Sequence, residues 1–368
     1  MKFLFIVQGE GRGHLTQAIS LAHLLRKQGH EICEVLVGKS SSRQLPAFFT
    51  EKIKAPICRF ESPNFLPTPK NKRNNLAKSI AYNLVKLPAF IRSTRFIQKR
   101  IRQSQADAVI NFYELLTGLT YALHSISTPQ YCIGHQYLFL HPEFRFPEKK
   151  RLSRLCLLGF TKLTCIGAYQ KLALSFHPMA DAPARHIRVV PPLLREEVLQ
   201  LHPTQGNYIL GYLVNAGFAS DVMAWHQKHP DIPLRFFWDK ETEIKKVDET
   251  LSFHPLDDEA FLEQMKSCKA YASTAGFESI CEAMYLNKKV LMVPAHIEQD
   301  CNAADAERQG IGCIAPTFNM DYLLKLCGQE EMHQPQLRPW FQRAPQIILH
   351  TLTNEPDIEY PFPMAYNR

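Results

Sequence analysis

The sequence STAGFESICEAMYLNKKVLMVPAHIEQDCNA, residues 273–303, decides the fold. A short apolar run before it, CKAYAS (268–273), predicts a buried strand, and a turn follows at Ala275–Gly276. The segment ESICEAMYL (278–286) then predicts a helix, and KVLMVP (289–294) predicts a second buried strand. A strand, a turn, a helix and another strand form a βαβ unit, because parallel strands need such a crossover. We therefore predict an α/β fold with parallel sheets.

Two loops of this unit are expected to bind an anion. Loops 273–279 and 295–302 each follow a predicted strand. They therefore lie beyond the carboxyl ends of parallel strands, where open α/β sheets bind ligands. The helix that starts after Gly276 also offers free backbone N–H groups and a positive dipole end. The stretch thus predicts a site for a phosphate-containing ligand.

The chain opens with a second unit of the same kind. The run KFLFIV (2–7) predicts a strand, GEGRGH (9–14) a glycine loop before an amphipathic helix, and EVLVG (34–38) the next strand. A dinucleotide fingerprint needs G-x-G-x-x-G, whereas the third glycine here comes one residue early, so the spacing argues against NAD. His14 follows that glycine, and an imidazole can act as a general base because its pKa lies near neutrality. The alternative is a polar residue at a helix start without chemistry.

Two further loops of the N-terminal half should share this edge. The strand ADAVINF (106–112) is followed by Tyr113 and Glu114, and the strand PQYCIGHQYLF (129–139) carries His135 and Gln136 in its loop. We expect these side chains on the acceptor side of a site, with ordinary loop polarity as the alternative. Further strands are predicted at 162–169, 186–194, 207–215, 233–239 and 251–256, and a further helix at 257–268.

Length and charge predict two domains. The chain has 368 residues, which is long for a single domain. Residues 1–200 carry 29 Lys and Arg against 12 Asp and Glu (net +17), and the remainder carries 14 against 23 (net −9). The N-terminal half is therefore expected to bind an anionic partner or surface. The predicted boundaries are 1–192 for the first domain, 193–206 for a linker, 207–335 for the second domain and 336–368 for a C-terminal helix and extended tail.

Composition predicts a cytoplasmic protein. The N-terminal apolar run is too short for a signal peptide, and no apolar stretch approaches the roughly 20 residues that span a bilayer. The ten cysteines include no C-x-x-C pair and do not cluster with histidines, which argues against zinc. We interpret them as buried thiols of a reducing compartment.

Residues 62–106 form a basic segment. They contain ten Lys and Arg and no acid, with Leu, Ile, Phe and Tyr at helical spacing. One interpretation is a pair of packed helices with solvated basic faces. The other is a surface that rests on anionic lipid at the inner face of the membrane, or holds an anionic acceptor. No nucleic-acid module accompanies the segment, so nucleic acid is not expected.

These motifs resemble those of nucleotide-sugar glycosyltransferases of the GT-B fold. The group closest in pattern contains the muramyl-pentapeptide N-acetylglucosaminyltransferase of peptidoglycan synthesis and related uncharacterised bacterial and archaeal transferases. The resemblance covers the whole chain in architecture but is specific at two places. The first is GEGRGH (9–14), similar to the family's G-x-G-x-G-H loop beside the acceptor. The second is residues 273–303, where the matching positions are Gly276, Glu282, Val293–Pro294, Glu298–Gln299 and Asn302–Ala303.

The resemblance implies two Rossmann-like domains that face each other across a cleft, an acceptor domain first and a nucleotide-sugar domain second, with the C-terminal helix returning toward the first. It implies a hexosyltransferase that uses a UDP-sugar, inverts the anomeric carbon and needs no cofactor. Glu282 would accept the ribose hydroxyls, Glu298 and Gln299 would orient the sugar, and His14 would deprotonate the acceptor. No D-x-D sequence is present, so no metal is expected. The residues expected on the donor side are Asn215, Gly217, His254, Thr274, Gly276, Phe277, Glu278, Ser279, Glu282, Glu298 and Gln299, and those on the acceptor side are Gly11, Arg12, Gly13, Glu114, His135 and Gln136.

Some alternatives stay open at this point. Glu278 stands where a small or apolar residue is common in the family, and a carboxylate would repel a diphosphate, so it is expected to face the sugar or to cap the helix. The acceptor is expected to be a lipid or a cell-envelope glycan precursor. The rival functions are a UDP-sugar 2-epimerase of the same fold and a non-catalytic nucleotide-sugar binding protein.

Overall fold

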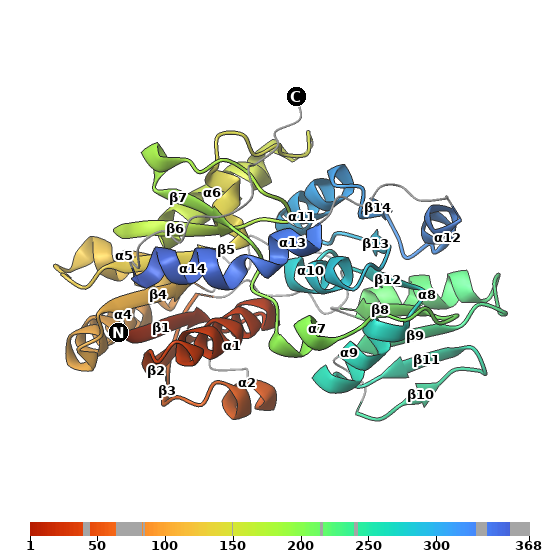
Figure 1. Ribbon diagram of the computed structural model, residues 1–368, viewed down its shortest axis with the longest axis horizontal. Helices are drawn as coiled ribbons and strands as arrows, with labels where there is room; N and C mark the ends of the chain where they lie inside the picture. Colours follow the sequence, from red (N-terminus) through yellow and green to blue (C-terminus); the bar gives the residue numbers. More distant parts are fainter. Residues whose placement is uncertain are drawn as a thin grey trace.

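The chain folds around two parallel sheets, one in each half (Figure 1). A computed structural model describes residues 1–39, 45–63, 83, 85–148, 150–213, 216–238, 242–328 and 337–353. The first sheet has the order β3-β2-β1-β4-β5-β6-β7 and the second the order β10-β11-β9-β8-β12-β13-β14. These are the two Rossmann-like units of a GT-B fold.

The first sheet is buried on both faces. Its central strand β1 (Lys2–Gln8) is apolar because helices cover both sides, and Phe3 to Val7 are fully buried. All its strand pairs are parallel. The other strands are β2 (Glu31–Gly38), β3 (Ile57–Phe60), β4 (Ala108–Phe112), β5 (Gln130–Gly134), β6 (Ala168–Leu174) and β7 (Ile187–Val190).

Amphipathic helices cover this sheet. Helix α1 (Arg12–Lys27) buries Leu15, Ala18, Leu21 and Leu25, which recur at helical spacing. The other helical segments are α2 (Ala47–Lys52), α4 (Leu87–Ser104), α5 (Leu115–Leu123), the 3₁₀ turn η1 (His135–Leu140), α6 (Arg151–Thr164) and the 3₁₀ turn η2 (Pro183–Arg185).

The second sheet repeats the pattern with shorter strands. Only the edge pair of β10 with β11 is antiparallel among the described strands. The strands are β8 (Ile209–Leu213), β9 (Leu234–Trp238), β10 (Lys245–Lys246), β11 (Leu251–His254), β12 (Ala270–Ser273), β13 (Val290–Met292) and β14 (Gly312–Ile314). The helical segments are α7 (Glu196–Gln200), the 3₁₀ turn η3 (Ala216–Phe218), α8 (Ala219–His226), α9 (Asp258–Ser267), α10 (Phe277–Tyr285), α11 (Ile297–Arg308) and α12 (Asp321–Cys327).

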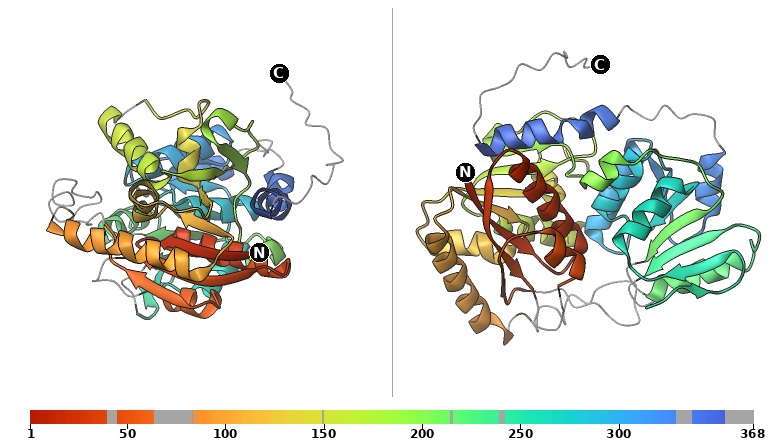
Figure 2. Two further views of the ribbon diagram at one scale, coloured as in Figure 1. Left: turned by 90° about the vertical axis from the view of Figure 1, so that its left-hand side faces the viewer. Right: turned by 60° about the horizontal axis from the view of Figure 1, so that its bottom comes forward.

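The last described helices return to the first half of the chain. Helix α13 (Leu337–Gln342) contacts α10 of the second half, and helix α14 (Ala344–Thr353) lies alongside the first sheet and contacts β7 (Figure 2). The buried indole of Trp340 donates its Nε1 hydrogen to the carbonyl oxygen of Ser175 at 2.9 Å. The returning C-terminal helix is thus confirmed, while the tail 354–368 lies outside the described residues. We place the boundary between the two units at the segment between β7 and β8.

Strand order reverses at one point in each sheet. In the first sheet the chain moves outward in opposite directions from β1 and β4, and in the second from β8 and β12. Ligands bind in open α/β sheets outside the carboxyl ends of the strands at such reversals. Topology therefore directs a site to the loops after β1 and β4 on one side and after β8 and β12 on the other.

Some expectations need correction. The strand predicted at 162–169 is wrong in its first half, because α6 continues to Thr164 and β6 begins only at Ala168. Cys156 is exposed, so the cysteines are not all buried. Of the basic segment 62–106, residues 64–82 and 84 lie outside the described part, and the remainder contains helix α4.

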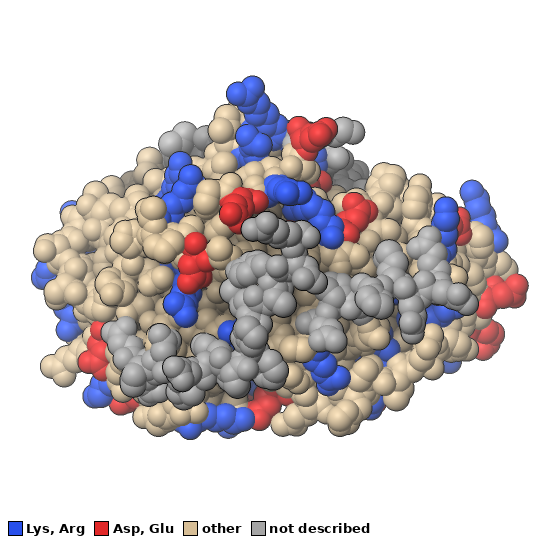
Figure 3. All heavy atoms as spheres, turned by 45° about the horizontal axis from the view of Figure 1, so that its top comes forward, with Lys and Arg blue, Asp and Glu red and all other residues tan. Residues whose placement is uncertain are grey.

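The described helices and the visible surface add two observations. None of the helices in the described residues is both long and apolar enough to cross a membrane. On the face shown in Figure 3, Lys and Arg side chains lie among Asp and Glu side chains rather than in one patch of a single sign.

Two helical glycines provide a matched test of how α5 and α6 pack. A Cβ atom on Gly118 of α5 would lie 2.0 Å from the carbonyl oxygen of Leu163 on α6, whereas a Cβ on Gly159 of α6 would meet nothing within 4 Å. We expect Gly118→Ala to lower the free energy of unfolding by about 1–3 kcal/mol through overpacking. Gly159→Ala should raise it by about 0.5–1 kcal/mol, since alanine favours the helix. Urea unfolding followed by circular dichroism measures both, and equal effects would contradict the close packing.

Candidate active site

A cavity of about 850 Å³ opens between the two sheets. One wall consists of the loops after β1 and β4, the turn η1 after β5, and helix α6. The other wall consists of the start of α9, the turn between β12 and α10, and the loop between β13 and α11. Loops at the carboxyl ends of strands in both sheets therefore meet in one place, as the topology requires.

His14 lies in the first turn of α1 on the N-terminal wall. Gly11, in extended conformation, precedes the helix, and His14 is the third helical residue. Its Nδ1 lies 3.3 Å from Oε1 of Gln17, and its ring stacks on Tyr113 with centroids 5.5 Å apart. Burial lowers the pKa of His14 below its ordinary value, and the carboxylate of Glu298 opposes this only in part. The imidazole is therefore neutral at neutral pH, the form that a general base requires.

Tyr113, from the loop expected on the acceptor side, supports His14 through its ring. Its backbone adopts a left-handed conformation (φ 60°), which is uncommon for a bulky residue and accumulates at functional sites. Its hydroxyl shares a 2.7 Å hydrogen bond with Oγ1 of Thr161 on α6. Its position after β4 was visible in the sequence, but the strained turn that directs its ring beneath His14 was not.

The turn before α10 forms the opposite wall. Its left-handed residue is Ala275 (φ 63°) and not Gly276, which is extended and forms the N-cap. Two polar groups hold the strained turn: Nδ2 of Asn302 donates to the Ala275 carbonyl oxygen at 3.0 Å, and Oγ of Ser273 accepts from the Ala275 N–H at 3.2 Å. The free N–H groups of the first turn of α10 lie at this wall, where an anion binds favourably.

Glu278 faces the N-terminal wall. Nε2 of Gln17 donates to its Oε1 at 2.5 Å, and its Cγ would touch a Cβ on Gly13 at 3.3 Å. It is the acidic residue of the first turn of α10, as one of the two expectations had it, and it is half-buried. Burial raises the pKa of Glu278 to about 8, with the Gln17 hydrogen bond opposing. The carboxyl group is therefore mostly protonated at neutral pH, so the repulsion expected of a carboxylate is removed.

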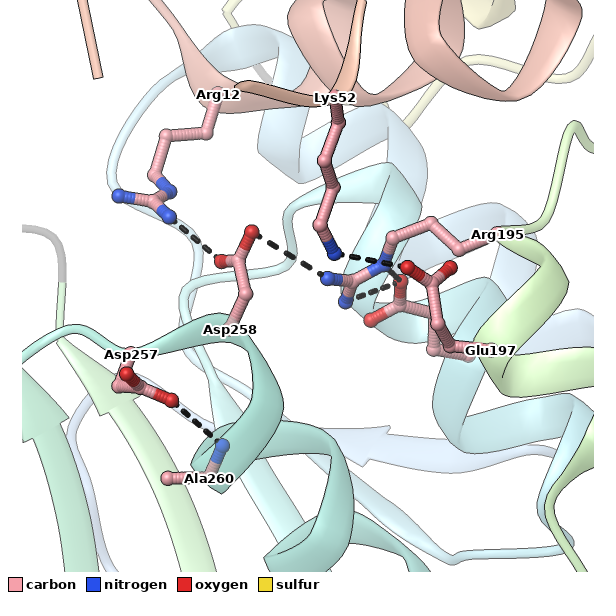
Figure 4. Close-up of polar contacts among 8 residues, drawn as sticks. Arg12, Lys52, Arg195, Glu197, Asp257, Asp258 and Ala260 are labelled. Atoms are coloured by element: carbon pink, nitrogen blue, oxygen red, sulfur yellow. Dashed lines mark hydrogen bonds and ion pairs between the residues drawn. The ribbon is translucent and has the colours of Figure 1, made fainter. Parts of the chain in front are cut away.

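Glu282 forms part of a chain of alternating charges that crosses the cavity. Both Nε and Nη2 of Arg195 bind its Oε1, at 2.7 and 2.6 Å. Arg195 also lies 3.7 Å from Oδ2 of Asp258, and Nη2 of Arg12 donates to Oδ1 of Asp258 at 2.6 Å (Figure 4). Burial raises the pKa of Glu282, and Arg195 opposes this. Arg195 and Asp258 escaped the sequence prediction, although Arg195 is only 10% exposed and lies in the predicted linker.

Figure 4 shows how neighbouring charges support this chain. Lys52 of α2 reaches Glu197 of α7 at 2.8 Å, next to Arg195. Asp257 caps α9 by accepting the Ala260 N–H at 2.7 Å, which fixes the helix that carries Asp258.

Glu298 and Gln299 lie at the start of α11. Oε1 of Glu298 accepts from Nε2 of Gln136 at 2.9 Å, and that same nitrogen lies 3.4 Å from Nε2 of His14. Oε1 of Gln299 instead accepts from the Ala295 N–H at 2.9 Å, so its carbonyl group holds the loop. Asp300 pairs with Lys150 across the cavity.

Glu114 and His135 are more buried than surface loop residues. Glu114 is fully buried and accepts from Oγ of Ser62 at 2.5 Å and from the Leu116 N–H at 3.1 Å, and burial raises its pKa to about 7. His135 donates from Nδ1 to the Leu174 carbonyl oxygen at 2.7 Å. Its ring stacks on Phe277 at the start of α10, with centroids 4.1 Å apart. Both line the cavity, but His135 serves as a contact between the walls.

The remaining expected residues divide between the cavity lining and positions outside it. Gly11, Arg12, Gly13, Gly276, Phe277 and Ser279 line the cavity. His254 lies outside the lining, bonds to Oγ of Ser252 at 2.9 Å and stacks on Phe237, and its donor-side role stays a prediction. Gly217 and the buried Thr274 are also outside the lining, and Asn215 lies outside the described residues. Within the described part of the chain, no group of three His, Cys, Asp or Glu side chains is arranged to hold a metal ion.

Comparison with known proteins agrees with this architecture. The sequence model of glycosyl transferase family 1 matches residues 1–325. None of the curated proteins matches the chain. Similar solved structures include the glycotransferase of kitacinnamycin (14% identity, TM-score 0.65, 96% of this chain and 98% of that chain) and Phytolacca americana UGT2 with UDP-2-fluoro-glucose and pterostilbene (13%, 0.63, 96% and 99%). Another is SsfS6 from Streptomyces sp. SF2575 (14%, 0.59, 96% and 99%). At such identities the structures show a shared fold.

The raised pKa of Glu278 predicts a pH dependence of stability. The pKa of a glutamate in the unfolded chain is about 4.3, and that of Glu278 in the native protein is about 8. Between these two pH values the native state therefore binds more protons than the unfolded state. Stability contributed by the protonated carboxyl is therefore lost as pH rises through this window. Glu278→Gln should reduce the loss of unfolding free energy between about pH 5 and about pH 8, on the order of 1–3 kcal/mol.

Urea unfolding at both pH values measures this loss. Glu51→Gln, at an exposed site on α2, is the matched control and should behave as the wild type. A Glu278→Gln protein that loses as much stability as the wild type would show that Glu278 is ionised in the native state.

Proposed function

The chain belongs to glycosyl transferase family 1 and is a GT-B glycosyltransferase that acts on nucleotide sugars, and we propose that it moves a sugar from a UDP-sugar to a hydroxyl group held beside His14. One observation carries the proposal: His14 and the N-terminal turn of α10 line the same cavity from opposite walls. A base and an anion site that face each other across one cavity are what such a transfer requires.

The donor lies against the second unit. Its diphosphate accepts hydrogen bonds from the free N–H groups at the start of α10. The protonated carboxyl of Glu278 does not repel it. Arg195 binds only Oε1 of Glu282, which leaves the other carboxyl oxygen to accept from the ribose hydroxyls. Two similar structures contain UDP-2-fluoro-glucose and UDP-L-rhamnose, which supports a UDP-sugar as donor.

The transfer is a single displacement. The acceptor hydroxyl gives its proton to Nε2 of His14, and its oxygen bonds to the anomeric carbon. The bond from that carbon to the diphosphate oxygen breaks, and its electron pair leaves with UDP, whose charge the dipole of α10 stabilises. Attack from the face opposite the diphosphate inverts the anomeric carbon. The residues need no cofactor for this step, and Glu298 holds the sugar hydroxyls near the reacting carbon.

The acceptor carries an apolar group. Leu157 and Phe160 of α6 line the cavity, and Leu152 and Leu155 of the same helix are 73% and 56% exposed. An apolar surface thus continues from the cavity to the outside of the molecule. Similar structures contain pterostilbene and quercetin, which are aromatic compounds that carry hydroxyl groups. A lipid-linked acceptor fits this surface, and membership in the peptidoglycan transferase group remains a proposal because the family match does not single out that group.

Variants of the two walls test the function by separate measurements. A panel of UDP-sugars is first screened by calorimetry, and transfer is then measured with lipid extracts and apolar alcohols. His14→Ala should slow transfer on the order of 10²–10⁴-fold with donor affinity unchanged. Glu282→Ala should weaken donor binding by about 1–3 kcal/mol because the ribose hydrogen bonds are lost.

Glu259→Ala, at an exposed position of α9, is the control and should change neither quantity. Epimerised sugar formed without any acceptor would favour the 2-epimerase, and donor binding without turnover would favour a non-catalytic binding protein. Either result would reject the transferase assignment.

We further propose that helix α6 rests on an anionic membrane, at the inner face where a lipid-linked acceptor would lie. Its exposed residues include Arg151 and Lys162 beside Leu152, Leu155 and Leu163, and the helix contains no acid.

Vesicle pelleting tests this contact. The protein should bind vesicles that contain phosphatidylserine at low salt, and binding should fall as salt screens the basic residues. Leu152→Ser with Leu155→Ser should weaken it, whereas Tyr322→Ser, at an exposed apolar position on α12, should not. Absence of vesicle binding together with transfer to a water-soluble apolar alcohol would contradict the membrane contact.

A further inference from the structure

Two amide side chains contact the two ring nitrogens of His14. Oε1 of Gln17, one turn further along α1, lies 3.3 Å from Nδ1. Nε2 of Gln136, in η1, lies 3.4 Å from Nε2 of the ring. Each amide is in turn bound to a carboxyl oxygen of the second unit: Gln17 Nε2 donates to Glu278 Oε1 at 2.5 Å, and Gln136 Nε2 donates to Glu298 Oε1 at 2.9 Å.

The carboxyl groups fix which way round each amide lies. Oε1 of Glu278 accepts from Gln17, so the proton of this neutral carboxyl group belongs on Oε2. A carboxyl oxygen without a proton only accepts hydrogen bonds, whereas an amide has a nitrogen that only donates and an oxygen that only accepts. With its nitrogen directed at Glu278, Gln17 presents its oxygen to Nδ1 of His14. With its nitrogen directed at Glu298, Gln136 presents that donor to Nε2 of His14 as well.

Both contacts select the same form of the imidazole. The oxygen of Gln17 needs a donor, so Nδ1 carries the proton. The nitrogen of Gln136 needs an acceptor, so Nε2 keeps its lone pair. In a neutral imidazole one nitrogen donates and the other accepts, and these two demands agree. The lone pair of Nε2 then faces the side where an acceptor hydroxyl has to give up its proton.

We propose that Gln17 and Glu278 are positioning residues that set the tautomer of His14, so that the general base is ready only when the second unit is closed against the first. The proposal rests on the assignment of His14 as the base. Glu278 comes from the turn that receives the donor diphosphate, whereas Gln17 and His14 come from the acceptor wall. The donor site and the base are therefore coupled by one amide.

Few charged groups face the ring besides these. Glu298 lies beyond Gln136 on the side of α11, and Tyr113 stacks beneath the ring with a pKa raised well above its ordinary value by burial, so that it stays neutral. Among the residues that the structure describes, the partner of Nδ1 is this amide and not a carboxylate. The hydrogen bond to Gln17 raises the pKa of His14 against the effect of burial, and a carboxylate in its place would add the attraction of a full charge.

Substitutions at Gln17 test the role. Gln17→Leu removes the acceptor at Nδ1, and turnover should fall on the order of 10-fold or more with donor affinity unchanged, since the wrong tautomer cannot accept the proton at Nε2. Gln17→Glu keeps an acceptor at Nδ1 and adds a charge that raises the pKa of His14. Turnover should therefore recover, while the acidic limb of the pH–rate profile moves to higher pH. Gln103→Leu, exposed on α4, is the matched control and should do neither.

The tautomer is also read directly, without turnover. Nitrogen-15 NMR of the full-length protein with labelled histidine, assigned through His14→Ala, should show an Nδ1–H imidazole in the wild type and a mixture of both forms in Gln17→Leu. Glu278→Leu should have the same effect through Gln17, which guards against a folding defect specific to one variant. An unchanged Nδ1–H signal in both variants would overturn the proposal.

The two hypotheses fail in different ways. If His14→Ala leaves transfer intact while Gln17→Leu still mixes the tautomers, the base assignment is wrong and the positioning holds. If His14→Ala abolishes transfer while Gln17→Leu has full turnover and an unchanged pH profile, His14 is the base and the positioning is wrong.

Discussion

The closed arrangement depends on burying acids of the second unit against partners from the first. Asp258, Glu278 and Glu298 each meet an arginine or an amide of the N-terminal wall. Removing a carboxylate from water is costly unless hydrogen bonds or an opposite charge replace the lost hydration. The two units therefore satisfy each other's polar groups when closed, and separation would return those groups to water. Of these three contacts, the pair of Arg12 with Asp258 joins a basic residue of the first half to an acidic residue of the second.

This constraint also explains the unusual state of the site. Burial makes Glu278 a weak acid and His14 a weak base at the same time, and only an amide lies between them. If Glu278 and His14 were both charged, they would attract each other strongly. Such a charged pair would compete with the proposed donor diphosphate for contacts at the start of α10. Neutral partners orient the ring without adding a charge nearby. In the proposed transfer, the charge on the leaving group would therefore be stabilised mainly by the helix N-terminus of α10.

Much of the fold and part of the site followed from sequence, for reasons that differ by residue. The βαβ units were predictable because buried parallel strands are nearly continuous apolar runs, and the glycine loop and the turn near Gly276 mark the ends of two such strands. Arg195 was missed because its position after β7 has no local pattern, and its role depends on Glu282 87 residues away. His254 lies outside the cavity lining, because position after a strand does not decide whether a side chain reaches the neighbouring cavity. The left-handed turns at Tyr113 and Ala275 were invisible because neither residue favours that conformation.

The returning helices α13 and α14 constrain how the molecule can open. The chain passes between the units twice, once between β7 and β8 and once through α13, which contacts α10 of the second unit and bonds to Ser175 of the first. A body attached by a single tether can turn in any direction, whereas one attached at two points turns mainly about the line that joins them. Opening and closing are therefore restricted mainly to rotation of one unit about a single axis that passes through the two connections. Each closure then returns the same amides to the same carboxyl groups, without any search over orientations.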